Sequence, residues 1–417
     1  MQGRTNRRPS LTQVACAALF TFFTGHWPPA TGYCQSATGH SEETRFDRVV
    51  VDNHFPDGYQ VEVADVNGDR KPDIIALGGS TCAWYENPTW KKQIVTAGKQ
   101  TPGIISSATA DLDGDGRAEI AIAYDFEMNE PTRGKLALAM QGSGSDEPWK
   151  FVPIADVGSI HRLRWGDIDG DTKLDLVVAP IFGRGAKPPR YDDQARIVAF
   201  QPQGDPKNAI WRRQPLLEHP VIHAIELRPL PAMQGRSAVL TADNEGVTIV
   251  GEGVITNGAS FTLTARSLVS GAPGEAPKRD CSEIHLGRLN DGRHFLATIE
   301  PWHGSDVVVW PESENGSLKF GSRTVLDSTL ADGHALWVAD VDGDGDDELF
   351  AGHRGTDHRV SMYDFDRSSG KWTRTVLDTK IAAQDLRGGD LDGDGTPDVV
   401  AIGGSTHNVI WYRPRRP

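Results

Sequence analysis

The amino-acid sequence predicts an all-β fold, a seven-bladed β-propeller, from three observations. An acidic loop of the form Asp-x-Asp-Gly-Asp-Gly-x-x-Asp/Glu, or a close variant, occurs five times, starting at Asp65, Asp111, Asp167, Asp340 and Asp390. Each loop is flanked by short apolar runs in a unit of roughly 45 to 60 residues, a period typical of propellers and solenoids. The 45 Gly, 26 Pro and 11 Trp among 417 residues suit many short strands joined by turns.

The first predicted element is an export signal. Three arginines precede an apolar run over residues 14–23, which is too short to span a bilayer. We expect residues 1–37 to be a signal peptide with a short linker, and residues 38–417 to form one propeller domain in a secreted or periplasmic protein. No later apolar run is long enough to span a membrane, so no membrane insertion is expected.

Charge and cysteine content limit the partners and the chemistry. The formal net charge of -14 at pH 7 argues against a nucleic-acid or anionic-membrane partner, because both need a basic surface. Cys34, Cys82 and Cys281 follow the signal at spacings that fit neither a disulfide framework nor a zinc-thiolate site. Neither a nucleic acid nor an anionic membrane is therefore expected as a partner.

Four short strands are predicted for each unit. In the first unit they cover residues 61–64, 74–77, 82–85 and 92–95, and four antiparallel strands make one propeller blade. Two units between the loops at Asp167 and Asp340 have lost the acidic loop, and one of them has the hairpin-type turn Asn290-Asp291-Gly292 instead. Including these two units gives seven blades.

The ring is predicted to close through an N-terminal outer strand. The last unit has its third strand over residues 409–412 and lacks an outer strand of its own. The segment 44–51, directly after the signal, has the pattern of an outer strand without a blade. Pairing the two segments would close the ring and remove exposed sheet edges.

The acidic loops predict calcium sites. Oxygen-bearing side chains at alternating positions, a turning Gly and an acid at the ninth position can surround a hard divalent cation, usually Ca²⁺. Arg70 and Thr172 stand where a Gly is usual. We expect a structural role for these ions. The predicted ligands are Asp65, Asn67, Asp69, Asp73, Asp111, Asp113, Asp115, Glu119, Asp167, Asp169, Asp171, Asp175, Asp340, Asp342, Asp344, Glu348, Asp390, Asp392, Asp394 and Asp398.

The repeated acidic loop between short apolar strands resembles the FG-GAP and VCBS repeats of integrin alpha-chain propellers and of many secreted bacterial proteins. The resemblance covers nearly all of the chain after the signal. It implies a calcium-binding propeller. It leaves the function open, because this propeller carries adhesion, carbohydrate binding and elimination chemistry alike.

Candidate functional residues gather at the channel face opposite the acidic loops. Six positions before the first loop Asp, or before its equivalent, His161, His223 and His334 occupy the same structural slot in three units. Loops between second and third strands add a further set to this face. It includes Glu300, His303, His353 and Arg354. His, Glu and Arg together suit a site for an acidic sugar or for a second divalent metal in the channel.

This face also resembles two groups of carbohydrate-acting propellers, the aldos-2-ulose dehydratases and the rhamnosyl-glucuronate polysaccharide lyases. The resemblance implies β-elimination on a uronate or keto sugar. A His or Tyr would act as the base, and Arg354, with Arg164 or Arg184, would neutralise the anion. The dehydratases carry additional domains after the propeller, whereas this sequence stops at the last predicted blade. The alternative is a non-catalytic propeller that binds a glycan or a protein, which needs no preorganised base and anion clamp.

Overall fold

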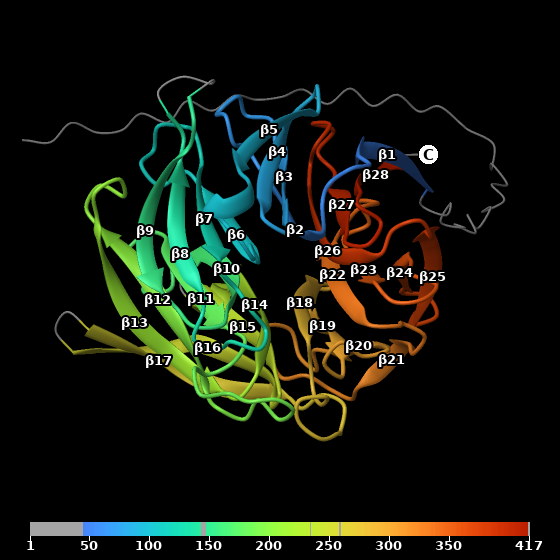
Figure 1. Ribbon diagram of the computed structural model, residues 1–417. Helices are drawn as coiled ribbons and strands as arrows, with labels where there is room; N and C mark the ends of the chain where they lie inside the picture. Colours follow the sequence, from blue (N-terminus) through green and yellow to red (C-terminus); the bar gives the residue numbers. More distant parts are fainter. Residues whose placement is uncertain (1–44, 143–146, 234, 258–259, 416–417) are drawn as a thin grey trace, which may run out of the picture. The chain divides into compact units, whose positions relative to one another are not determined.

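The computed structural model describes residues 45–142, 147–233, 235–257 and 260–415. These residues form seven four-stranded antiparallel sheets, which confirms the predicted seven-bladed β-propeller (Figure 1). Helical structure within the described residues is limited to the 3₁₀ turns Gly98–Gln100 (η1) and Pro231–Met233 (η2). None of it is long and apolar enough to cross a membrane. The predicted signal peptide and linker, residues 1–37, lie outside the described residues.

Each blade consists of an inner strand, two middle strands and an outer strand. The first four blades are β2 (Gly58–Ala64), β3 (Asp73–Gly78), β4 (Thr81–Glu86) and β5 (Lys91–Thr96); β6 (Ser106–Ala110), β7 (Glu119–Tyr124), β8 (Lys135–Met140) and β9 (Lys150–Asp156); β10 (Ile160–Gly166), β11 (Asp175–Pro180), β12 (Ala195–Gln203) and β13 (Ile210–His219); and β14 (Ile222–Pro229), β15 (Ser237–Asp243), β16 (Gly246–Asn257) and β17 (Ser260–Val269). The last three are β18 (Glu283–Arg288), β19 (His294–Glu300), β20 (Asp306–Pro311) and β21 (Thr324–Asp327); β22 (Gly333–Ala339), β23 (Glu348–His353), β24 (Val360–Asp366) and β25 (Lys371–Asp378); and β26 (Ala383–Gly389), β27 (Asp398–Gly403), β28 (Val409–Arg415) and β1 (Arg45–Asp52).

The last blade takes its outer strand from the other end of the chain. Strand β1 pairs antiparallel with β28, with Arg45 opposite Arg415 and Asp52 opposite Val409 (Figure 1). The Arg48 side chain of β1 also donates to the Asp378 carboxylate at 2.6 Å, which ties the strand to β25 of the neighbouring blade. The edge of β28 is therefore covered by strand pairing.

The core lies between neighbouring blades. Strands β3 and β27 are buried along their whole length, and their sequences are apolar runs without alternation. A middle strand has a neighbouring blade on each face, so both faces need apolar side chains. Val61 and Ile74 of the first blade, for example, pack with Val400 and Ile402 of the last. Burying one such side chain stabilises the fold by about 1.5–3 kcal/mol.

The inner strands surround the central channel. Each of β2, β6, β10, β14, β18, β22 and β26 contacts the next inner strand around the ring, and β26 contacts β2. The acidic loops follow the inner strands, so the beginnings of these strands lie at the opposite mouth of the channel. We call the two mouths the loop side and the histidine side.

Candidate functional site

The histidine side is organised by β-bulges. In five inner strands, the pairing with the next strand shifts register directly after the first residue. A bulge leaves one residue outside the ladder and redirects its side chain. The residues at these bulges are Tyr59, His161, His223, His334 and Gln384. The slot that the sequence identifies is thus a bulge position at the start of the inner strand.

The three slot histidines have fixed tautomers. The Nδ1 atom of His161 lies 2.9 Å from the carbonyl oxygen of His223, and that of His223 lies 2.7 Å from the carbonyl oxygen of Ser282. The Nδ1 atom of His334 lies 2.6 Å from the carbonyl oxygen of Gln384. A carbonyl only accepts, so each Nδ1 carries the proton and each Nε2 presents a lone pair.

Tyr59 links two of these lone pairs. Its hydroxyl oxygen is 2.8 Å from Nε2 of His161 and 3.4 Å from Nε2 of His334. The Arg162 Nη1 atom lies 3.1 Å from Nε2 of His161 and 3.4 Å from the Tyr59 hydroxyl. The lone pair of His161 is therefore engaged by two donors, whereas among the described residues that of His334 has only the longer contact with Tyr59.

His303 has the opposite tautomer. It follows β19, and its Nδ1 atom is 3.1 Å from Nη2 of Arg354. A guanidinium only donates, so this Nδ1 accepts and Nε2 of His303 carries the proton. That Nε2 donates to Nε2 of His223 at 2.9 Å. Arg354 is held by Asp332, with Nε 2.7 Å from Oδ2, and by the Gln384 side-chain oxygen at 2.9 Å.

The electrostatics keep these imidazoles neutral. Burial lowers the pKa of His161, His223, His303 and His334 well below 6.5, and the nearby guanidinium groups lower it further. His161, His223 and His334 are at most 2% exposed. A neutral imidazole is a proton acceptor at neutral pH. The cluster of Tyr59, His161, His223, His303, His334, Arg162 and Arg354, which we call the channel cluster, therefore combines proton acceptors with permanent cations.

Aromatic side chains border the channel cluster. The Trp302 ring lies 6.2 Å from the His223 ring and 5.2 Å from the His303 ring. Its indole Nε1 is buried and has no hydrogen-bond partner among the described residues. Phe182 meets Trp302 edge-on at 6.0 Å and stacks on Tyr191 at 4.2 Å. Phe182 and Trp302 are 1% and 4% exposed, so this aromatic wall packs against the channel cluster.

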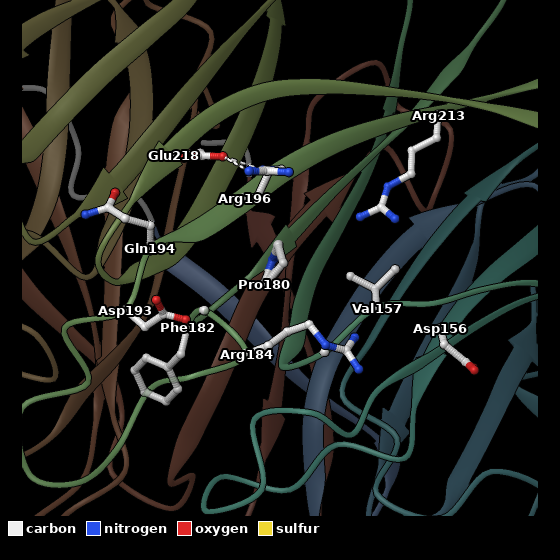
Figure 2. A pocket seen from close by; sticks show the side chains of 12 residues that line it. Asp156, Val157, Pro180, Phe182, Arg184, Asp193, Gln194, Arg196, Arg213 and Glu218 are labelled. Carbon is white, nitrogen blue, oxygen red and sulfur yellow. Dashed lines mark hydrogen bonds and ion pairs between the residues drawn. The ribbon is translucent and has the colours of Figure 1, made fainter.

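A cavity of about 450 Å³ lies beyond this wall (Figure 2). Phe182 forms part of its lining, together with Arg184, Arg196, Arg213 and Glu218. Figure 2 shows Arg196 paired with Glu218. Arg184 is exposed and donates to the Thr132 carbonyl at 3.3 Å. Arg184 therefore lines this cavity and is not part of the channel cluster.

Besides Arg184, and Arg164 on the loop side of the channel, two predicted site residues lie outside the channel cluster. Glu300 is fully buried, and its carboxylate pairs with Arg323 at 2.7 Å while accepting from Thr298 and Trp310. The Nδ1 atom of His353 lies 3.2 Å from the carbonyl oxygen of Ala331. Both side chains hold their own blades together, so the prediction that they join the histidines is corrected.

Three residues of the site were missing from the predicted set. Tyr59 occupies the same slot as the histidines, and this position in the repeat could have identified it as a site residue. Arg162 is only 6% exposed and lies 3.5 Å from Glu283, which also lies 3.0 Å from Nδ1 of His223. Asp332 holds Arg354 from the turn before β22. No sequence motif marks Arg162 or Asp332.

The five acidic loops share one hydrogen-bonded scaffold. In each loop the ninth-position carboxylate accepts the N–H of the second residue, as Glu348 does from Val341 at 2.8 Å. The equivalent pairs are Asp73 with Val66, Glu119 with Leu112, Asp175 with Ile168, and Asp398 with Leu391. The carboxylate of the first Asp accepts the N–H of the sixth residue in all five loops. The carboxylate of the fifth residue accepts the N–H of the seventh, as in Asp69, Asp171 and Asp394.

The scaffold persists where the sixth residue is not Gly. This position has a left-handed backbone, with φ of 89° at Gly116 and 90° at Gly345. Arg70 and Thr172 adopt the same conformation, at φ of 68° and 70°. A β-branched residue is strained there, so the loop geometry dominates over the local preference of Thr172.

Three carboxylates in most of these loops could hold one cation. Oxygen atoms of Asp340, Asp342 and Asp344 lie within 4.8 Å of one another. The same holds for Asp111, Asp113 and Asp115, for Asp167, Asp169 and Asp175, and for Asp390, Asp392 and Asp398. In the Asp65 loop, Asn67 replaces a carboxylate, and the described residues there form no such group. Buried Oε1 of Glu348 and Oδ1 of Asp390 have no hydrogen-bond partner among the described residues. These donors fit a hard divalent cation.

Comparison with known proteins agrees with the fold and the loops. A model of the FG-GAP-like repeat matches residues 65–122 and 340–401. The protein is thus a propeller that contains FG-GAP-like repeats, as its acidic loops predict.

Two known proteins are similar over most of the chain. It is 24% identical over 386 residues to aldos-2-ulose dehydratase of Phanerodontia chrysosporium. That match covers 81% of this chain and 41% of the dehydratase, so the chain spans less than half the length of this relative. A solved exotype rhamnogalacturonan lyase matches with a TM-score of 0.46 and 13% identity, over 89% of this chain and 73% of the lyase.

Proposed function

We propose that this protein is an exported, calcium-stabilised propeller that carries out a β-elimination on a carbohydrate at the channel cluster. The observation that carries the proposal is the convergence of neutral imidazoles from several blades beside Arg162 and Arg354. The similarity to aldos-2-ulose dehydratase supports a carbohydrate substrate. A uronate or keto sugar fits best, because its carbonyl group acidifies the neighbouring C–H bond and its negative charge grows as the proton leaves.

In this proposal His334 is the base. Its Nε2 lone pair is the least engaged in the cluster, and its Nδ1 proton is held by the Gln384 carbonyl. Nε2 takes the proton next to the carbonyl group, the electron pair of that C–H bond forms the C=C bond, and the C–O bond at the next carbon breaks. Arg354 supplies positive charge for the developing enolate.

Tyr59 is the proposed acid. Its hydroxyl proton goes to the leaving oxygen, and Arg162 at 3.4 Å stabilises the phenolate that remains. The proton on His334 then returns to Tyr59 across their 3.4 Å contact. The cycle leaves both residues as they began, with the proton and the leaving group balanced in the products.

The same side chains also fit a divalent metal. One ligand atom each of His223, His303 and His334 lie within 4.8 Å of one another. Nε2 of His223 and Nε2 of His334 carry no proton. His303 would have to move its Nε2 proton to Nδ1, and would then exchange its contact with Arg354 for one with Asp332 Oδ1 at 3.5 Å. A bound metal would supply Lewis-acid polarisation of the substrate carbonyl. Metal analysis of the purified protein, with His223→Ala as the comparison, tests this arrangement.

The test of the proposed function is the appearance of a product with a conjugated double bond, followed by ultraviolet absorbance, with uronate polysaccharides and 2-keto sugars as substrates. His334→Ala is expected to lower kcat by at least about 100-fold, because a positioned base contributes that much. The matched control is His54→Ala, since His54 is exposed on the loop after β1. Full activity of His334→Ala would refute the role of this residue. Glycan binding without turnover in the wild type would favour the binding module instead.

A further inference from the structure

A second cavity, of about 530 Å³, occupies the loop side of the channel. Its wall comes from inner strands β10, β14, β18, β22 and β26 and from the loop that begins at Asp340. The cavity shares these strands with the channel cluster but uses their other ends. On β10, for example, His161 faces the histidine side and Arg164 lines this cavity.

Two arginines in this cavity occupy equivalent positions of different blades. Arg164 and Arg387 each stand three residues before the first Asp of an acidic loop. Each Nη1 donates to the carbonyl of the preceding residue at 2.7 Å. Burial and the charge of Arg387 lower the pKa of Arg164 to about 10, because the two cations repel each other. Like charges share this cavity at a free-energy cost.

Of these two arginines, Arg387 has a carboxylate partner within hydrogen-bond reach and Arg164 does not. Its Nη1 lies 3.0 Å from Oδ1 of Asp385. For Arg164, no ion pair is found in the part of the chain that the structure describes. Glu62 lies near Arg164, but burial raises the pKa of its carboxyl, and it accepts hydrogen bonds from Ser107 and Thr109.

Most of the other charged residues of the cavity have hydrogen-bond partners of their own. Glu226 pairs with Arg228 at 2.7 Å and lies 3.3 Å from Nδ1 of His285. Asp347 accepts the backbone N–H of Arg288 at 2.7 Å. Asp340 accepts two backbone N–H groups within its own loop. Among the described residues, Arg164 therefore has no carboxylate within hydrogen-bond reach, and the charges of Asp385 and Glu62 act on it only from a longer distance.

We propose that the loop side of the channel binds a small oxyanion, a carboxylate or a phosphate, between Arg164 and Arg387. Planar guanidinium groups match the paired oxygens of such anions, and charge-assisted hydrogen bonds in a sheltered cavity are strong. The bound anion offsets the repulsion between the two cations. The site is independent of the proposed elimination, because none of its residues belongs to the channel cluster.

The test is isothermal titration of the full-length protein with inorganic phosphate, and separately with acetate, at constant ionic strength set by NaCl. Free calcium is removed beforehand so that it does not associate with phosphate. We expect saturable binding of at least one of the two anions, and the comparison tells phosphate from carboxylate. Arg164→Gln is expected to weaken binding at least about ten-fold, because it removes a charge-assisted pair.

Arg45→Gln is the matched control, since Arg45 is an exposed arginine on β1 and lines neither cavity. A second readout is the rise in melting temperature on adding the anion, which follows from binding to the folded state alone. It should occur in the wild type and in Arg45→Gln but not in Arg164→Gln. If Arg164→Gln does not fold, Arg387→Lys takes its place, because Lys keeps the charge but loses the planar fork. No saturable binding of either anion, or equal binding by wild type and both cavity variants, would overturn the proposal.

Discussion

Glu348→Gln tests whether the acidic loops hold a divalent cation. The Glu348 side chain is 1% exposed; its Oε2 accepts the Val341 N–H, and its Oε1 has no partner among the described residues. Gln has the same shape and keeps an acceptor for Val341. It removes the negative charge that a cation would need. The substitution should therefore have opposite effects on stability with and without calcium.

The effect without calcium follows from the pKa. Burial, and next the charge of Asp342, raise the pKa of Glu348 from 4.5 to about 9 in the folded protein. The folded state thus holds this carboxyl protonated at pH 7, while the unfolded chain ionises it. Stability is lost as the pH rises above 4.5, because the unfolded state then binds fewer protons. From pH 4.5 to pH 7, at about 1.4 kcal/mol per pH unit, the loss is about 3 kcal/mol.

Gln carries no charge in either state, so Glu348→Gln should be more stable than the wild type by up to about 3 kcal/mol in chelator at pH 7. With calcium in excess the order of stability should reverse, because only the wild type keeps the carboxylate ligand at the ninth position of the loop. Urea unfolding in both buffers measures the two differences. The reasoning would be refuted if calcium did not change the unfolding free energy of the wild type, or if the variant were less stable than the wild type in both buffers.

Three further predictions follow from single residues. Thr172→Gly should stabilise the protein by about 1 kcal/mol in urea unfolding, because it relieves a left-handed β-branched residue; a loss would contradict the strain. Arg354→Gln should move the acid limb of kcat/KM to higher pH, because a cation that lowers the pKa of His334 is gone; an unmoved limb would contradict this role. Phe350→Ala should cost about 3–5 kcal/mol, because Phe350 is fully buried and meets Phe46 of β1 at 6.2 Å; a smaller loss would mean that the site collapses.

The blades and the acidic loops could be predicted because their determinants are local. Every hydrogen bond of the loop scaffold joins residues within one nine-residue motif, so the pattern of Asp and Gly is sufficient to specify it. The strand pattern repeats with each unit, which gave the seven blades without knowledge of any contact between them. The metal in the loops stays a prediction.

The channel cluster is a different case, because its partners come from distant parts of the chain. The slot in the repeat identified His161, His223 and His334, since equivalent positions of a ring face one axis. It could not show that a bulge aims them inward or that each Nδ1 donates to the next blade. Nor could it separate His303 from Glu300, which come from the same loop region.

The sequence alone therefore determined the ring, the repeated loops and the face on which to look for function, because each depends on residues close together in the chain. Tertiary structure alone decided that Glu300 pairs with Arg323, that Arg354 reaches His303, and that Arg164 shares a cavity with Arg387. The physical reason is that the hydrogen bonds, burial and charge of these groups are set by side chains from other strands and other blades, whose approach no local pattern encodes.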